Sequence, residues 1–283
     1  MPVFDTPEPI SVTVEVALGE VRIVASDRRD TVVEVRPSNP AKKSDVAAAA
    51  QTRVDYADGK LVVKGPRGWK PHVWPWGSSE SIDIEIELPA GSRLRGDAAA
   101  ATFHCSGRLG ECVVKTSAGD MHVARADRVQ LRAAHGDITV EQVAGDAEVT
   151  TSSGAVRIDR IDGTATIKNA NGDTWIGRVA GELRVNAANG RIVVEHAQDA
   201  VAAKTANGDV RIEEVTRGSI VARTARGKVD IGVHDGVPAW LDLDTSFGKV
   251  RSELEAAGRP AAGEDAVEVF ARSAFGDITI HRA

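Results

Sequence analysis

Three tryptophans crowd into one short segment, and such a cluster is typical of a binding surface. The segment 65–79, which contains GWKPHVWPWG, carries five candidate interaction residues: Trp69, Lys70, His72, Trp74 and Trp76. Tryptophan is enriched among the residues that dominate interface energetics, and its amphipathic ring also suits membrane interfaces. The alternative is a loop that covers apolar surface of the protein itself with its indoles. Covering the protein's own surface is the more ordinary role for such a loop, and the aromatic loop is still the strongest candidate for partner binding in this sequence.

A recurrent acidic position could instead hold metal ions. The residue after a repeated glycine is acidic at Asp120, Asp137, Asp173, Asp209 and Asp277 and cationic at Arg191, Lys228 and Lys249. Calcium takes about six to eight oxygen ligands, and the known calcium-binding solenoid repeat has doubled glycines. Here the glycines are single and cations interrupt the row. Because aspartate also caps its own turn, the row is interpreted as turn chemistry. No metal or other cofactor is expected.

The position just before three of these glycines is asparagine. Asn171, Asn189 and Asn207 occupy it in consecutive repeats. Stacked asparagines can hydrogen-bond to one another along a repeat axis, and asparagine tolerates left-handed turn geometry. A structural ladder is therefore predicted, with a carbohydrate-binding row as the alternative.

Histidines, cysteines and paired carboxylates add little chemistry. The seven histidines form no HExxH or similar metal spacing. Cys105 and Cys112 lie near His104 and could be zinc ligands, but both are interpreted as small buried apolar side chains. Glu195 and Glu213, on adjacent repeats, could reach the carboxylate spacing of glycosidases by chance. Because the regular repeats have no inserted loops to wall off a cleft, no enzymatic activity is expected.

These residues recur because the chain itself repeats. A phrase such as ANGDVRI returns about every 18 residues, with its glycine at Gly119, Gly136, Gly154, Gly172, Gly190, Gly208, Gly227, Gly248 and Gly276. A second turn falls nine residues before most of these glycines. Each repeat is therefore predicted to consist of strand, turn, strand, turn.

Apolar residues alternate with polar ones on both strands of the repeat, as Ile167 and Ile176 do around Gly172. Identical columns at a constant period predict an all-β fold, a single-stranded parallel β-solenoid with two main strands per coil. A left-handed β-helix would need a small aliphatic residue every sixth position. That stepping meets Asp173 and Arg191, so a right-handed coil is expected from the usual hand of parallel crossovers.

The beginning of the chain follows this pattern less strictly. Residues 37–51, which include DVAAAA, could form a short helix, and residues 65–79 hold the aromatic loop. We expect residues 1–95 to form an irregular N-terminal portion or cap, and residues 96–283 to form the regular repeats. Solenoid ends need covering because unpaired strands invite edge-to-edge growth. A separate small β-domain before residue 90 is the alternative.

Composition excludes several classes of protein. The 283 residues are 42% hydrophobic, which is enough for a core, and their formal net charge is -6. Because nucleic-acid binders are usually basic, no nucleic-acid partner is expected. No run of eighteen apolar residues exists, so no membrane span is predicted. The start, MPVFDTPEP, has no basic region followed by an apolar one, and a cytoplasmic location is therefore expected.

The phrases ANGDVRI and VAGELRV, preceded by IDIEIELPAGSRL, resemble a bacterial family of β-strand-repeat proteins of unknown function. This DUF4097-like family carries the label "putative adhesin". The resemblance covers roughly residues 81–283. It implies the solenoid architecture and offers no catalytic motif.

The sequence thus predicts a non-enzymatic interaction or scaffold protein, whose partner is an unidentified protein or a second copy of the chain. One alternative is an adhesin-like binder of surface glycans or proteins. A second is a self-assembling filament resembling the bactofilins, because the final coil, VEVFARSAFGDITIHRA, carries no evident cap. A carbohydrate-active enzyme ranks last.

Overall fold

The computed structural model describes residues 1–66, 80–254 and 266–283, and most of these residues lie in β-strands. The β-solenoid predicted from the repeats is confirmed. The chain forms two compact units, Met1–Thr139 and Val140–Ala283, and the predicted division at residue 95 falls inside β7 (Arg93–Ala118) of the first. Within the described ranges, no helix is long and apolar enough to cross a membrane.

The first unit is organised by two long strands that run parallel to each other. β2 (Ser11–Ser26) pairs with β7 from Ser11↔Arg93 to Val24↔Ser106, and β7 pairs in parallel with β8 (Met121–His135). β9 (Ile138–Val143) contains the boundary between the units. Long alternating sequences such as SVTVEVALGEVRIVAS bury one side of each strand, which favours this stacking.

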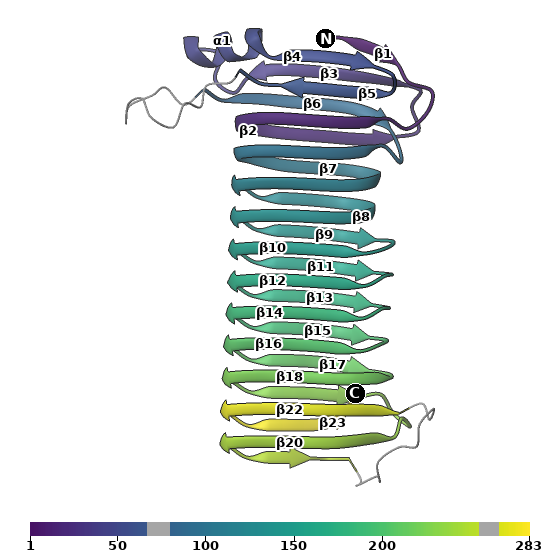
Figure 1. The fold of residues 1–283 in the computed structure, drawn as a ribbon, viewed down its shortest axis with the longest axis vertical. Coiled ribbons are helices and arrows are strands. Elements are labelled where there is room, and N and C mark those ends of the chain that lie inside the picture. Colours follow the sequence, from purple (N-terminus) through teal and green to yellow (C-terminus); the bar gives the residue numbers. More distant parts are fainter. Residues whose placement is uncertain (67–79, 255–265) are drawn as a thin grey trace. The chain divides into compact units, whose positions relative to one another are not determined.

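Shorter elements complete the first unit (Figure 1). They are β1 (Val3–Asp5), β3 (Asp30–Pro37), α1 (Lys43–Gln51), β4 (Arg53–Ala57), β5 (Lys60–Lys64) and β6 (Ile82–Pro89). The pairs β1–β3, β3–β6 and β4–β5 are antiparallel, whereas β5 and β6 pair with β2 in parallel. The helix lies inside the segment where a short helix was predicted.

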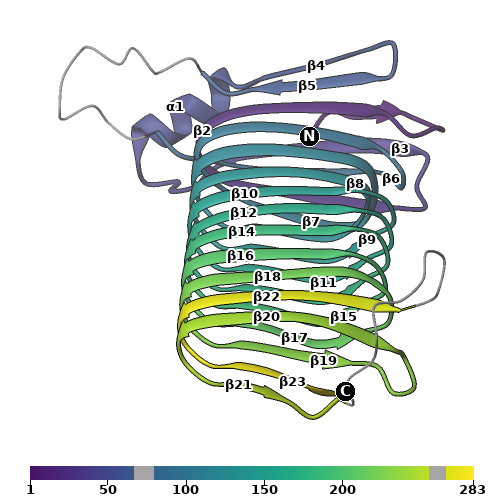
Figure 2. The same ribbon diagram turned by 60° about the horizontal axis from the view of Figure 1, so that its bottom comes forward.

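The second unit is a stack of regular coils. Its even-numbered strands are β10 (Ala147–Ser153), β12 (Ala165–Asn171), β14 (Leu183–Asn189), β16 (Val201–Asn207), β18 (Gly218–Arg226), β20 (Ala239–Phe247) and β22 (Val267–Phe275). The odd-numbered strands are β11 (Val156–Ile161), β13 (Thr174–Val179), β15 (Ile192–Ala197), β17 (Val210–Val215), β19 (Val229–Val233), β21 (Val250–Ser252) and β23 (Ile278–Arg282). The two series form two walls of the coil (Figure 2).

The register between coils follows the predicted repeat. Ile167 pairs with Val185 on the even side, and Ile176 pairs with Val194 on the odd side. All four side chains are 0% exposed. The predicted apolar columns therefore form the core between the two walls.

The order of coils departs from the order of the sequence at one place. β22 pairs with β18 on one edge and with β20 on the other, and β23 likewise pairs with β19 and β21. The C-terminal coil is therefore an inner coil, and β20–β21 lies outside it (Figure 1). The final coil of the sequence, which carries no evident cap of its own, is thus covered by the coil that precedes it in the chain.

The turns explain why the repeat is marked by glycine. Gly172 has φ 137°, and a Cβ atom on it would lie 2.2 Å from the carbonyl oxygen of Gly154 in the preceding coil. Positive φ and this close approach both require glycine. At the inner corner beside several turns, a small polar side chain donates to such a carbonyl, as Thr224 Oγ1 does to Gly208 O at 2.9 Å and Ser273 Oγ does to Gly227 O at 3.0 Å.

Candidate functional site

The aromatic loop cannot be placed among the described residues. Trp69, Lys70, His72, Trp74 and Trp76 all lie in the segment 67–79, outside the part of the chain that the structure describes. Their role in binding stays a prediction.

The aspartate row has a structural partner in the coil that follows in space. Asp173 Oδ1 accepts the backbone N–H of Arg191 at 2.8 Å, and Asp209 Oδ1 accepts that of Lys228 at 2.8 Å. Asp277 Oδ1 accepts the N–H of Lys249, in keeping with the altered coil order. Across the described ranges, no cluster of acidic, histidine or cysteine side chains could hold a metal ion. The role of these carboxylates is structural, as predicted, but each one caps the turn of a neighbouring coil instead of its own turn.

The asparagines form the predicted ladder. Asn189 Nδ2 donates to Asn171 Oδ1 at 2.8 Å, and Asn207 Nδ2 donates to Asn189 Oδ1 at 2.9 Å. All three residues are exposed at the ends of their strands. The ladder thus leaves part of each amide open to solvent, because an amide has two N–H donors and a carbonyl with two lone pairs.

The cysteines are buried and reduced in the first unit. Cys105 and Cys112 are 1% and 0% exposed, respectively. A hydrogen bond with Cys112, together with burial, raises the pKa of the Cys105 thiol well above its usual range. Because the thiolate is the metal-binding and nucleophilic form, these side chains act as core residues, as predicted.

Two histidines converge on one carboxylate on the odd-numbered wall. His196 Nδ1 lies 2.6 Å from Glu214 Oε2, and His234 Nδ1 lies 2.5 Å from Glu214 Oε1. The hydrogen bonds with His234 and then His196 lower the pKa of the Glu214 carboxyl. The three side chains come from consecutive coils and tie them together on the surface.

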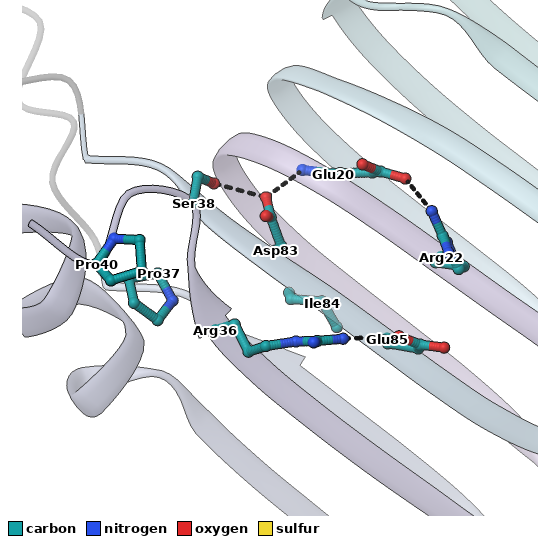
Figure 3. A pocket seen from close by; sticks show the side chains of 9 residues that line it. All are labelled: Glu20, Arg22, Arg36, Pro37, Ser38, Pro40, Asp83, Ile84 and Glu85. Atoms are coloured by element: carbon teal, nitrogen blue, oxygen red, sulfur yellow. Dashed lines mark hydrogen bonds and ion pairs between the residues drawn. The ribbon is translucent and has the colours of Figure 1, made fainter.

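A groove of about 330 Å³ lies on the first unit, between β2, β3 and β6. Its charged groups are directed at one another (Figure 3): Arg36 Nη2 donates to Glu85 Oε2 at 2.9 Å, and Arg22 Nη2 donates to Glu20 Oε1 at 3.1 Å. Asp83 accepts from Ser38 Oγ and from the backbone N–H of Glu20. The groove is thus lined by side chains that already satisfy one another, which gives it no evident reactive group.

The outer surface of β12, β14, β16 and β18 differs from this groove, because all of its charged side chains are positive. These strands contain no aspartate or glutamate, and they carry the basic residues Lys168, Arg184, Lys204, Arg223 and Arg226. All five side chains are exposed. We call the outward residues of these four strands the cationic face. It belongs to a protein whose formal net charge is -6.

The register arranges the cationic face into rows that run along the stack. One row consists of Lys168, Asn186, Lys204 and Arg223, which pair in consecutive coils. A neighbouring row is made of alanines two residues further along: Ala170, Ala188, Ala206 and Ala225. The asparagine ladder follows at the strand ends and continues into Arg226. Cations, methyl groups and amides therefore lie in parallel lines.

Most cations of this face have no partner. Arg184 pairs with Glu182 at 2.7 Å, whereas Lys168, Lys204, Arg223 and Arg226 join no ion pair within the described ranges. Adjacent strands are about 4.8 Å apart, and two like charges about 5 Å apart in water repel each other by roughly 0.8 kcal/mol. A bound anion would therefore relieve the repulsion between these cations.

The row is closed at one end by an ion pair. On β22, Arg272 occupies the position that follows Arg223, and its Nη2 donates to both carboxylate oxygens of Asp242 at 2.8 Å. At the strand ends, Phe275 and Phe247 stack with ring centroids 4.9 Å apart. The unpaired cations thus occupy the interior coils of the second unit.

The sequence matches the Toastrack DUF4097 family over residues 9–281. The chain belongs to this family. Solved structures that resemble this Toastrack chain include a "putative adhesin" from Bacteroides fragilis. It is 12% identical over 99% of this chain and 95% of its own, with a TM-score of 0.43. A "putative adhesin" from Parabacteroides distasonis is 14% identical over 82% and 95%, with a TM-score of 0.45.

A third similar structure is a "putative cell adhesion protein" from Clostridium sporogenes. It is 9% identical over 100% of the Toastrack chain and 98% of its own, with a TM-score of 0.27. No curated protein matches the sequence.

Sequence reasoning missed the cationic face of this Toastrack protein. The repeat pattern indicated only that polar residues alternate with the apolar ones on both strands of the repeat. The signal was nevertheless present, because the stretches ATIKNAN, LRVNAAN, VAAKTAN and GSIVARTAR lack acidic residues while the stretches between them contain several. Sorting outward residues by wall, instead of by repeat, would have revealed it.

Proposed function

We propose that this chain is a non-enzymatic interaction protein that binds an anionic partner through the cationic face of its second unit. The observation that carries the proposal is the row of unpaired cations, Lys168, Lys204 and Arg223, on strands without any acidic residue. An exposed row of like charge is unfavourable for the isolated fold and becomes favourable when an anion neutralises it. The rigid coil holds the row in place before binding.

The adjoining surface supports this choice. Ala188, Ala206 and Ala225 are exposed beside the row, and a methyl group is shorter than a lysine or arginine side chain. A partner can therefore approach the backbone closely while it contacts the cations. A solenoid suits this task because it presents the same residue types at a constant spacing.

The direct test is to immobilise polyglutamate or dextran sulfate and to measure binding of the full chain to each polymer by biolayer interferometry. The triple variant K168Q/K204Q/R223Q, called the face variant, should lose binding roughly a hundredfold, because three charged contacts disappear. Binding of the unchanged protein should also weaken as salt rises, since exposed charges are screened.

The matched control removes three cations from the other wall of the same unit. Arg157, Arg160 and Arg178 are exposed on β11 and β13, and R157Q/R160Q/R178Q, called the control variant, changes the net charge by the same amount. It should bind like the unchanged protein. Equal loss in both variants would mean that only total charge matters, and absence of binding by the unchanged protein would refute the proposal.

A further inference from the structure

We infer that the partner of the cationic face is a linear acidic polysaccharide that lies along the stack axis. This inference rests on the function proposed above and adds the chemical class of the ligand. It depends on the arrangement of the rows, on the amides beside the cations and on the side chains that the face lacks.

The cations lie in a line instead of forming a cluster. Lys204 and Arg223 occupy adjacent coils, and Lys168 lies two coils from Lys204. With strands about 4.8 Å apart, the row from Lys168 to Arg223 spans roughly 15 Å. A compact anion would contact one or two of these side chains. A polymer with anionic groups at regular intervals can contact all of them.

Amides accompany the cations along the same line. Asn186 lies within the row, between the positions of Lys168 and Lys204, and is exposed. Asn189 and Asn207 each donate one hydrogen bond within the ladder, which leaves each of these amides a second N–H donor. Neutral groups that both donate and accept are suited to hydroxyls. The ligand is therefore rich in hydroxyl groups as well as in charge.

The face lacks the side chains that other polyanions require. β12, β14, β16 and β18 contain no aromatic residue, so bases of a single-stranded nucleic acid would have no ring on which to stack. Apart from Val221, the outward apolar residues are alanines. Binding in a membrane interface needs larger apolar groups, and protein interfaces are anchored by tryptophan, tyrosine and arginine in pockets.

Isothermal titration of the full chain with sodium polygalacturonate, a linear polymer of carboxylated sugars, tests the inference. Binding should appear at low salt and should strengthen with oligomer length up to roughly four sugars, about one for each coil from Lys168 to Arg223. The face variant should bind roughly a hundredfold more weakly, and the control variant should bind normally. Uncharged dextran should not bind.

A second variant tests the hydrogen bonds to sugar hydroxyls separately from the charged contacts. Asn186→Ala removes an exposed amide from the row without removing a charge. It should weaken polygalacturonate binding several-fold and polyglutamate binding clearly less, because polyglutamate offers carboxylates and amides to Asn186 but no hydroxyls. Equal effects on both polymers would overturn the assignment of Asn186 to hydroxyl recognition and, with it, the sugar class.

The remaining outcomes separate the inference from the proposed function. If polyglutamate binds through the cationic face and polygalacturonate does not, the polysaccharide inference is wrong and the proposed function stands. Tighter binding of single-stranded DNA or of phosphatidylglycerol vesicles would also overturn it. If no polyanion binds, both proposals fail.

Discussion

The two walls of the second unit share one core but differ in whether their outward charged side chains form ion pairs. On the odd-numbered wall, Arg160 pairs with Asp162 at 2.7 Å, and Glu214 holds two histidines. Arg157 pairs with Asp159 at 3.0 Å and lies over the ring of Trp175. On the even-numbered wall, the cations of β12, β16 and β18 have no such partners among the described residues. Arg157 and Arg160 of the first wall thus meet carboxylates, as Arg211 does with Glu213, whereas the cations of β12, β16 and β18 do not within the described part of the chain.

This contrast shows where selection for folding and selection for binding can be separated in a repeat protein. Inward positions are constrained on both walls because every coil must bury its apolar column against its neighbours. Outward positions are free of that constraint. A wall with unneutralised charge is therefore informative about binding, and a wall of mutual ion pairs is informative mainly about solubility.

The largest expected effect tests whether the buried side chains of the two walls contribute equally to stability. Ile167→Ala beneath the cationic face and Ile176→Ala beneath the odd-numbered wall each remove a side chain that is 0% exposed. Each should lower the free energy of unfolding by about 2–5 kcal/mol through lost burial and a residual cavity. Chemical denaturation measures both, and a cost confined to one wall would show that the cores differ.

The next test concerns the ion pair between Asp242 and Arg272 on the even-numbered wall. Asp242→Asn should free Arg272 from its paired carboxylate and extend the row of available cations by one coil. Polygalacturonate affinity should rise by roughly threefold, and stability should fall by about 0.5–1 kcal/mol, because the pair is partly exposed. Titration and denaturation of the same preparation measure both quantities. An unchanged affinity would place Arg272 outside the binding row.

The histidine–carboxylate cluster should give the odd-numbered wall its own pH dependence. The pKa of Glu214 is lowered in the folded protein, so its contribution to stability is present above its ordinary pKa of about 4.5 and is lost as the pH falls through the lower folded value. Glu214→Gln should therefore cost up to about 1 kcal/mol near pH 6 and progressively less below pH 4.5. Thermal unfolding across pH measures the difference, and a constant cost would contradict it.

The smallest effect is a difference in sign between the walls. Lys204→Gln removes one of two adjacent like charges and should raise the free energy of unfolding by a few tenths of a kcal/mol at low salt. Arg160→Gln removes a partner of Asp162 and should lower it by about as much. Both changes should vanish at high salt. Two changes of the same sign would remove the electrostatic distinction between the walls.

Much of this fold was predictable because a repeat constrains many residues at once. The alternation around Gly172 and the asparagine ladder both follow from an 18-residue period, and the structure has both of them. The order of the last coils was harder to predict, since it depends on which coil best covers a neighbour. Ser252 at an inward position of β21 was the signal, because a coil with a polar inward residue is better suited to the end of the stack.

The candidate site was only partly predictable. Local sequence places Lys168, Lys204 and Arg223 on outward positions, but whether they meet carboxylates depends on which strands become neighbours. That information lies in the pairing of the coils and not in any single repeat. The tryptophan cluster is conspicuous in the sequence, and its contribution stays a prediction, because segment 67–79 lies outside the described residues.

The inserted position of β22 and β23 has a consequence for synthesis on the ribosome. β20 and β21 emerge first, yet the coil against which they pack has not been translated. The edges of β18 and β19 also wait for that same coil. A nascent chain can therefore stack its coils in step with translation only as far as β19. A premature stop codon before residue 266 would delete an inner layer of the stack, so even a short truncation would leave two mismatched edges.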